Sequence, residues 1–470
     1  MDKRIIQNRY QGEIARGVDY SPTWKGWVVG VPDTQTNDSD FANDAFQSLW
    51  GDQFQLAPDG SKSNPYNNGA HYRGDLRTLG KNRFNVVRLY NWNGARGATP
   101  KNKFYGRAHL NFLDYAEKQG LKVIIPVSDY FLSDSEYAWN HATLPDYSFE
   151  SAPGSIQVCF RQIVNSIIDP KTGNVHKAVH SISVGNEGDI GEGLMSPPTS
   201  AANFLARTIW WIYNLRNSSW SQNIKNTNTP ISATFSNADQ GGNGKTSWFG
   251  CVVNGVSTKT PLPNGCALHS ALGGYFDVQV KGLATVDPEY MDYYYNSINV
   301  SQIGTSKPFK CSLSETLNAY DNWQSGWPFE QFEVPLLFME VFTANRYDFN
   351  PPNLQVEAAL TQIAILESYL KKHDAGTSNS TTFFMGYNYF EFNDEYNGDT
   401  LNKAMGLFQY EGSPEATVHT GTTSYPYGPF SELSNMPYPY YNLTATKGPD
   451  GASLIAQMRA LFPKVTVPSR

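Results

Sequence analysis

Eight short runs of β-branched and aromatic residues alternate along the chain with amphipathic stretches, and this alternation restricts the possible folds more than any other feature. The runs span 15–20, 84–90, 121–127, 179–185, 230–235, 291–296, 334–339 and 382–390. Strands that alternate with helical segments form parallel sheets with helical crossovers. Eight such units in about 400 residues predict an α/β fold, a single (β/α)8 TIM barrel, rather than two domains.

The segments between the runs predict how the chain is divided. Helices are expected up to residue 80 and at 110–119, 155–168, 200–217 and 354–372. Two long insertions, at about 23–72 and 236–288, are expected in loops at the barrel mouth. We therefore expect a barrel domain over 1–422, and a Tyr/Pro-rich tail over 423–470 that packs on the barrel.

The composition argues against two classes of partner. The 470 residues include 36 Lys and Arg against 43 Asp and Glu, a net charge of −7, whereas nucleic-acid-binding proteins normally carry a basic surface. No apolar run approaches the roughly 18 residues that a membrane-spanning helix needs. Charged residues make up 17% and aromatic residues 14%, which suits either stacking on sugars or a secreted type of surface with few lysines. We expect no nucleic-acid and no membrane partner.

The four cysteines and the first residues give less information. Cys251 and Cys266 flank a short loop and either form a disulfide or stay free thiols. Neither a CxxC nor an HExxH motif occurs, so we expect no metal site and no cofactor. The first ten residues contain no apolar signal-peptide segment, while the composition favours an extracellular or surface location, so the compartment stays open.

Two glutamates follow predicted strands at the positions where such barrels carry their reacting groups, the C-terminal strand ends. Glu187 follows the fourth run in the sequence Gly-Asn-Glu, and Glu340 follows the seventh in Leu-Phe-Met-Glu. Retaining glycoside cleavage needs two carboxyl groups about 5–5.5 Å apart, one as the acid and one as the nucleophile. Because strands four and seven oppose each other in an eight-stranded barrel, we expect the two side chains to face across its mouth.

These motifs resemble the clan of retaining (β/α)8 glycosidases with glutamates on strands four and seven. Within it, the chain resembles two β-1,3-glucan-active groups, the endo-β-1,3-glucanases of glycoside hydrolase family seventeen and the fungal β-1,3-glucanosyltransferases of family seventy-two. The matching segments are 17–22, 85–90, 184–187, 292–296, 334–340, 389–395 and 405–408. They occur in the same order and cover the chain from about Arg16 to Phe408.

The resemblance implies roles for five residues. Glu187 would be the acid/base and Glu340 the nucleophile, with Asn186 contacting the 2-hydroxyl of the sugar beside the scissile bond. Arg88 on strand two and Tyr295 on strand six would donate hydrogen bonds to Glu340, keeping its carboxylate ionised and aimed. From the residues alone, Arg88 is also compatible with a structural ion pair, and two neighbouring tyrosines compete with Tyr295.

Four more residues are candidate sugar contacts. Tyr20, Tyr90 and Trp92 lie in or beside the segments that follow the first two strands, where aromatic rings either stack on pyranose faces or belong to the core. Glu391 begins an acidic cluster, ending at Glu395, after strand eight. This cluster binds substrate, binds calcium or is a solvated loop.

Three functions remain open from the sequence. The first is a retaining hydrolase or transglycosylase acting on β-glucan, most readily β-1,3-linked, through a covalent glycosyl-enzyme intermediate. The second is a weakly active or inactive carbohydrate-binding or structural protein on a glycosidase barrel. The third is a glycosidase of the same clan that acts on other β-linked polysaccharides. All three imply a polysaccharide or oligosaccharide partner, and none determines the oligomeric state.

Overall fold

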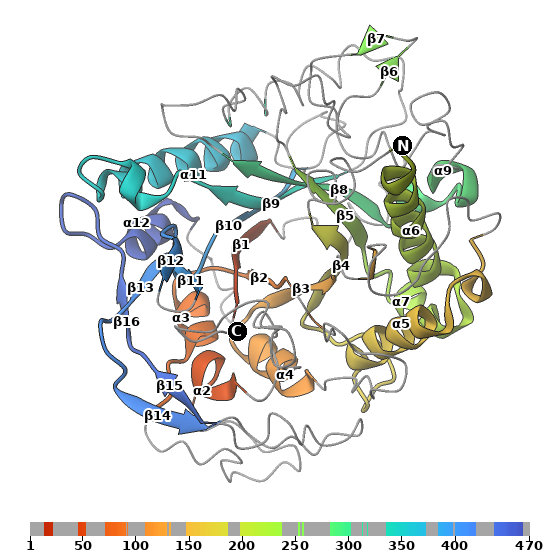
Figure 1. The fold of residues 1–470 in the computed structure, drawn as a ribbon, viewed down its shortest axis with the longest axis horizontal. Helices are drawn as coiled ribbons and strands as arrows, with labels where there is room; N and C mark the ends of the chain where they lie inside the picture. The colour runs from red at the N-terminus through yellow and green to blue at the C-terminus, as the bar shows by residue number, and fades with distance from the viewer. Residues whose placement is uncertain are drawn as a thin grey trace.

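The structure is a computed structural model, and it describes a barrel together with part of the chain around it (Figure 1). The described residues are 14–21, 46–52, 71–90, 92, 109–128, 131–132, 147–186, 198–236, 252–253, 256–257, 283–301, 313, 317, 335–372, 384–397, 400–419 and 437–463. The predicted insertions and the predicted boundary at 422/423 therefore lie largely outside the described residues.

Eight parallel strands form a closed barrel. They are β1 (Ala15–Asp19), β2 (Val86–Arg88), β3 (Lys122–Val127), β4 (Val179–Asn186), β5 (Ile231–Ser236), β8 (Tyr294–Ser301), β9 (Leu336–Phe342) and β10 (Phe384–Tyr389). Each strand pairs with the barrel strand before it and the one after it in the chain, and β1 pairs with β10 to close the ring. Such parallel pairing requires a crossover between successive strands. The predicted (β/α)8 TIM barrel is thereby confirmed.

Helices surround the barrel (Figure 1). They are α2 (Gln47–Trp50), α3 (Asp75–Lys81), α4 (Leu110–Lys118), α5 (Gly154–Ser166), α6 (Pro198–Asn217), α7 (Gln222–Asn226), α9 (Leu283–Val286), α11 (Leu354–Lys372) and α12 (Leu454–Leu461). Helix α4 buries Leu110, Leu113 and Ala116, which recur at helical spacing, and exposes its end. Gly120 follows with a φ of 73°, the left-handed conformation that commonly terminates a helix.

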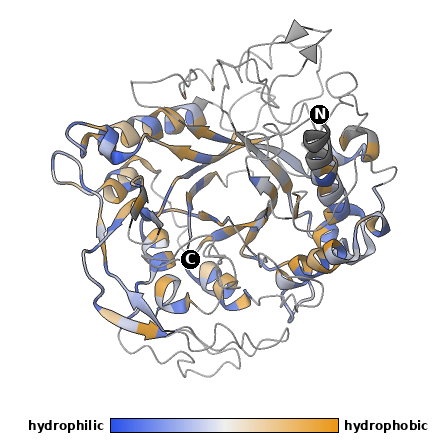
Figure 2. Cartoon of the chain, viewed as in Figure 1, coloured by the Kyte–Doolittle hydropathy of each residue, from blue (hydrophilic) through white to orange (hydrophobic). Residues whose placement is uncertain are grey.

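Two apolar clusters hold the barrel together. The smaller cluster fills the barrel interior with Ala15, Val86, Ile124, Tyr295, Leu337, Met339 and Met385. The larger one lies between strands and helices, and it includes Leu336 and Phe338 of β9. Residues of one strand thus alternate between the interior and the helix-facing side. Figure 2 shows hydrophobic residues on both the barrel strands and the helices around them.

Short antiparallel strand pairs and a final helix make up the rest of the described structure. The strands are β6 (Val252–Val253), β7 (Val256–Ser257), β11 (Glu395–Asn397), β12 (Thr400–Lys403), β13 (Phe408–Tyr410), β14 (Ala416–His419), β15 (Pro437–Tyr440) and β16 (Leu443–Ala445). Strand β16 pairs with β13, β15 pairs with β14, and α12 packs on α11. No helix in the described ranges has the length and apolar character of a membrane span.

Candidate active site

Glu340 lies near the C-terminal end of β9, and its side chain is 8% exposed. By strict alternation from Leu337 and Met339, which face the interior, Glu340 would point toward the helices. The register between β8 and β9 shifts between Ile298 and Asn299, so that Asn299 lies opposite Glu340. Such irregularities re-aim side chains next to active sites. Here the carboxylate of Glu340 points to the strands across the barrel.

Two side chains from the second strand and its end hold Glu340. Arg88 Nη1 donates to Glu340 Oε1 at 2.5 Å, and the hydroxyl of Tyr90 donates to the same oxygen at 2.8 Å. The guanidinium also lies 4.3 Å from the centre of the Tyr90 ring, a cation–π distance. Burial, with the charges of Asp19 and Glu340, raises the pKa of Tyr90 well above its usual value. The phenol therefore keeps its proton and acts as a donor.

Arg88 extends the contact to two more strands. Its Nη2 donates to Asn186 Oδ1 at 2.7 Å, at the end of β4, and its Nη1 lies 3.4 Å from Asp19 Oδ1, at the end of β1. Burial raises the pKa of Asp19 well above its usual range, opposed by Arg88 and reinforced by Glu340. One buried arginine thus contacts strand ends on three other sides of the mouth, so the predicted role of Arg88 beside Glu340 has the required geometry.

The structure corrects the prediction for Tyr295. The sixth strand begins at Tyr294 and runs to Ser301, beyond the expected 291–296. Tyr295 therefore lies deep in the barrel, where its hydroxyl bonds to Ser181 Oγ at 2.8 Å instead of to Glu340. Tyr90 makes the phenol contact that was expected of Tyr295. The mouth residue of this strand is Asn299, whose Nδ2 donates to Asn186 Oδ1 at 2.9 Å.

Tyr20 and Trp92, two of the candidate sugar contacts, are fully buried. The hydroxyl of Tyr20 donates to Asp75 Oδ2 at 2.9 Å. The indole of Trp92 donates to Ser166 Oγ at 2.6 Å, and its ring lies against His109. In this conformation neither ring has a free face for a pyranose, so both occupy the core position that the sequence left as the alternative.

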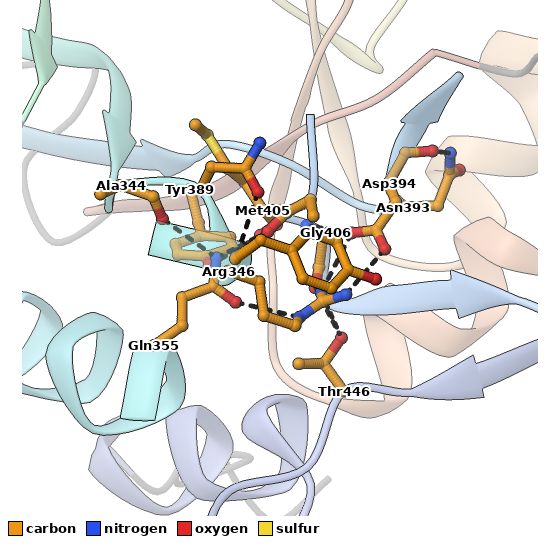
Figure 3. Close-up of polar contacts among 12 residues, drawn as sticks. Ala344, Arg346, Gln355, Tyr389, Asn393, Asp394, Met405, Gly406 and Thr446 are labelled. Atoms are coloured by element: carbon orange, nitrogen blue, oxygen red, sulfur yellow. Dashed lines mark hydrogen bonds and ion pairs between the residues drawn. The ribbon is translucent and has the colours of Figure 1, made fainter. Parts of the chain in front are cut away.

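The acidic cluster after β10 divides in two. Asp394 forms a two-point ion pair with Arg346, at 2.9 and 3.0 Å (Figure 3). Arg346 also donates to Thr446 Oγ1 at 3.2 Å, which ties the segment after β9 to the segment after β16. Asp394 therefore helps to hold the chain's last described part against the barrel, which is a structural role.

Glu391 and Glu395 form the other half. Burial, with the charge of Glu395, raises the pKa of Glu391 well above its usual value. Lys403 Nζ lies 3.2 Å from Glu395 Oε2 and 4.8 Å from the centre of the Phe390 ring. Burial lowers the pKa of Lys403, but Glu395, Glu391 and Glu340 raise it above its usual value. Lys403 thus interacts electrostatically with both Glu391 and Glu340, and the substrate-binding role of Glu391 stays a prediction.

Three residues of this constellation were not singled out from the sequence. Asp19 and Asn299 lie at the ends of the first and sixth strands, and Lys403 lies on the β11–β12 hairpin. The strand-end rule that selected Glu187 and Glu340 would have selected Asp19, which closes the run Ala-Arg-Gly-Val-Asp. The same rule could have selected Asn299 only if the bounds of strand six had been predicted correctly. No sequence signal points to Lys403, because its position depends on a hairpin.

Glu187 lies outside the described residues, although Asn186, which precedes it, is described. Among the described residues, no group of three or more His, Cys, Asp or Glu side chains is arranged to hold a metal ion. The described mouth therefore consists of carboxyl, amide, phenol and cationic groups.

Comparison with known proteins finds no matching family model and no matching curated protein. Solved structures that resemble the chain include a β-glucosidase from Exiguobacterium marinum, at 12% identity, with 85% of this chain and 94% of that chain covered and a TM-score of 0.45. Another is a mutant of Saccharomyces cerevisiae Gas2p in complex with laminaritetraose and laminaripentaose, at 12% identity, 83% and 58% coverage and a TM-score of 0.39. A third is a family 1 β-glucosidase from Thermotoga maritima, at 9% identity, 85% and 92% coverage and a TM-score of 0.43. At these values the likeness says nothing of what this chain acts on.

Proposed function

We propose that this protein is a retaining glycoside hydrolase or transglycosylase that acts on β-glucan, most readily on β-1,3 linkages. One observation carries the proposal: a glutamate at the end of the seventh barrel strand accepts hydrogen bonds from Arg88 and Tyr90, and the same arginine holds Asn186. A binding protein needs hydroxyl contacts but has no need of a carboxylate held by a buried cation in the centre of the mouth.

The contacts of Glu340 indicate which of its oxygens reacts. Within the described part of the chain both hydrogen bonds go to Oε1 and none to Oε2. Oε1 thus fixes the carboxylate, and Oε2 is the oxygen that attacks the anomeric carbon. As the bond from Oε2 to that carbon forms, the bond from the carbon to the glycosidic oxygen breaks. A glycosyl ester of Glu340 results.

In this proposal Glu187 gives its proton to the departing glycosidic oxygen. In the second step, the Glu187 carboxylate takes a proton from water or from a hydroxyl of a second sugar. That oxygen attacks the anomeric carbon, the ester bond breaks, and Glu340 returns as a carboxylate. Water gives hydrolysis, and a sugar gives transglycosylation.

The test is incubation of the protein with laminarin-type β-1,3-oligosaccharides, with reducing ends counted and products sized. Shorter products indicate hydrolysis, and products longer than the substrate indicate transglycosylation. Glu340→Gln keeps the shape of the side chain but removes the nucleophile, so activity falls by a factor on the order of 10³ or more. No change on β-1,3, β-1,4 and β-1,6 glucans, with binding retained, would instead make the protein a carbohydrate-binding protein.

A further inference from the structure

The orientation of the Asn299 amide follows from a chain of contacts that begins at Arg88. A guanidinium can only donate, so the Asn186 atom that faces Arg88 Nη2 must be its oxygen. That same oxygen lies 2.9 Å from the Asn299 amide, so the Asn299 atom that faces it must be the donor Nδ2. The remaining end of the Asn299 amide is therefore Oδ1, an acceptor.

This acceptor is buried and has no partner in the part of the chain that the structure describes. Asn299 is 1% exposed, and its Oδ1 makes no hydrogen bond to any described residue. Leaving a buried acceptor unsatisfied costs roughly 1–3 kcal/mol, and native proteins rarely do so without a functional reason. Because Oδ1 can only accept, whatever satisfies it must bring an O–H or N–H group.

Asn299 also lies in the right place to contact a substrate. It is the register partner of Glu340 on the neighbouring strand, and through Asn186 and Arg88 it belongs to the network that holds Glu340. Four strands, β2, β4, β8 and β9, contribute to this network. The unpartnered acceptor therefore belongs to the same hydrogen-bond network as the carboxylate of Glu340.

We infer that Asn299 is a substrate-binding residue whose Oδ1 accepts a hydrogen bond from one hydroxyl group of the sugar bound at Glu340, and whose Nδ2 positions Asn186. This inference rests on the proposed function, because it assigns the sugar to that site. An amide oxygen accepts from any O–H or N–H group, and a hydroxyl is the donor that every sugar ring presents. A sugar that lacks this one hydroxyl loses the bond and leaves Oδ1 unsatisfied.

The test is a double-mutant cycle between the protein and the ligand. Binding of laminaritriose and its monodeoxy analogues is measured by calorimetry in Glu340→Gln and in Glu340→Gln with Asn299→Ala. In the protein that keeps Asn299, we expect one deoxy analogue to bind about 10-fold more weakly than laminaritriose. In the protein with Asn299→Ala, we expect that analogue and laminaritriose to bind with equal affinity. Equal losses for every analogue in both proteins overturn the inference.

Two controls separate this result from other effects. Ser297→Ala removes a buried hydroxyl of the same strand that bonds to Thr234 and to the carbonyl of Ala233, and we expect unchanged discrimination among the analogues. Thermal unfolding of each variant shows that the barrel is intact. If the coupling appears but the unmutated protein cleaves no glucan, the inference stands and the proposed hydrolysis fails. If no oligosaccharide binds, both are overturned.

Discussion

Arg88 joins Glu340 to Asn186 across the barrel mouth, with Nη1 2.5 Å from the carboxylate of one and Nη2 2.7 Å from the amide oxygen of the other. The two acceptors come from β9, which carries the predicted nucleophile, and from β4, which directly precedes the predicted acid/base. The distance between these strand ends is therefore set in part by a rigid, planar group. An arginine suits this task because its donors lie in a fixed fork.

Arg88→Lys tests this bridging directly. A lysine keeps the positive charge near Glu340 but presents one point charge on a flexible chain, so it does not reproduce both contacts. We expect kcat/KM to fall by roughly 10- to 100-fold, the value of a hydrogen bond to a charged group, with a smaller change in the melting temperature. Arg88→Met, which leaves Glu340 and Asp19 without their cation, should lower the free energy of unfolding by about 3–5 kcal/mol. Equal activity of the wild-type protein and Arg88→Lys would contradict the bridging role.

Tyr90→Phe and Tyr295→Phe form a matched pair. Each substitution removes one hydroxyl from a tyrosine ring, but only that of Tyr90 contacts Glu340, whereas that of Tyr295 contacts Ser181. We expect Tyr90→Phe to lower kcat/KM by roughly 10- to 100-fold and Tyr295→Phe to leave it within about 2-fold. Steady-state kinetics on one β-glucan substrate decides between them. The reverse order would restore the assignment that the sequence favoured.

The raised pKa of Glu391 makes a prediction about pH. An ordinary glutamate has a pKa of about 4.3 in an unfolded chain, whereas burial and Glu395 raise that of Glu391 in the folded protein. Between these two pKa values the folded protein binds the proton more tightly than the unfolded chain. This group's contribution to stability is therefore full below about pH 4.3 and is lost as the pH rises toward the folded pKa.

Glu391→Gln removes this dependence, because an amide does not titrate. We expect the variant's melting temperature to rise relative to that of the wild-type protein as the pH increases from about 4 to 8. Glu150→Gln, at an exposed position, is the control and should follow the wild-type curve. Parallel curves for Glu391→Gln and the wild-type protein would show that Glu391 is ionised in the folded state.

The Arg346–Asp394 pair should be needed for stability. Both side chains are buried, and they bond to each other at two points (Figure 3). Arg346→Met should lower the free energy of unfolding by about 3–5 kcal/mol, and the double variant with Asp394→Leu should recover most of the loss, because no unpaired charge remains. Urea denaturation measures both. Arg77→Met, which breaks the half-exposed 3.9 Å pair with Asp52, should cost less than about 1 kcal/mol.

The barrel could be predicted because its strands are short, apolar and separated by helical stretches. Seven of the eight expected strands coincide with observed ones to within a few residues, and α11 has the expected bounds. The prediction of strand six was wrong because the aromatic residues Tyr293, Tyr294 and Tyr295 suggested that they form its centre. In the structure Tyr293 precedes the strand, and the less apolar Ser297 and Asn299 belong to it. Aromatic content signals burial, and these tyrosines are buried, but it does not locate a strand's end.

In the candidate site, too, some residues could be predicted from the sequence and others could not. Glu340 follows from strand ends, Arg88 and Asn186 were assigned roles through the family resemblance, and the structure brings the three together. Tyr20 and Trp92 did not follow this rule, because rings beside the mouth pack inward against Phe392 and His109. Glu340 faces the mouth because of a register shift between β8 and β9, and Lys403 is brought near Glu395 by a hairpin. Both features depend on how strands pair, so no single segment of the sequence predicts them.

Closure of the barrel by β1 and β10 has a consequence for synthesis. Arg16 and its partner Glu367 are 351 residues apart in the chain. At about 5–20 residues per second, the first strand waits roughly 20–70 s on the ribosome before the helix that carries Glu367 is made, and β10 follows later still. During that time one edge of β1 is unpaired, and an unpaired edge can template association with other chains. A circular permutant that begins between two neighbouring barrel strands would make β1 and β10 in succession and shorten the exposure of this edge.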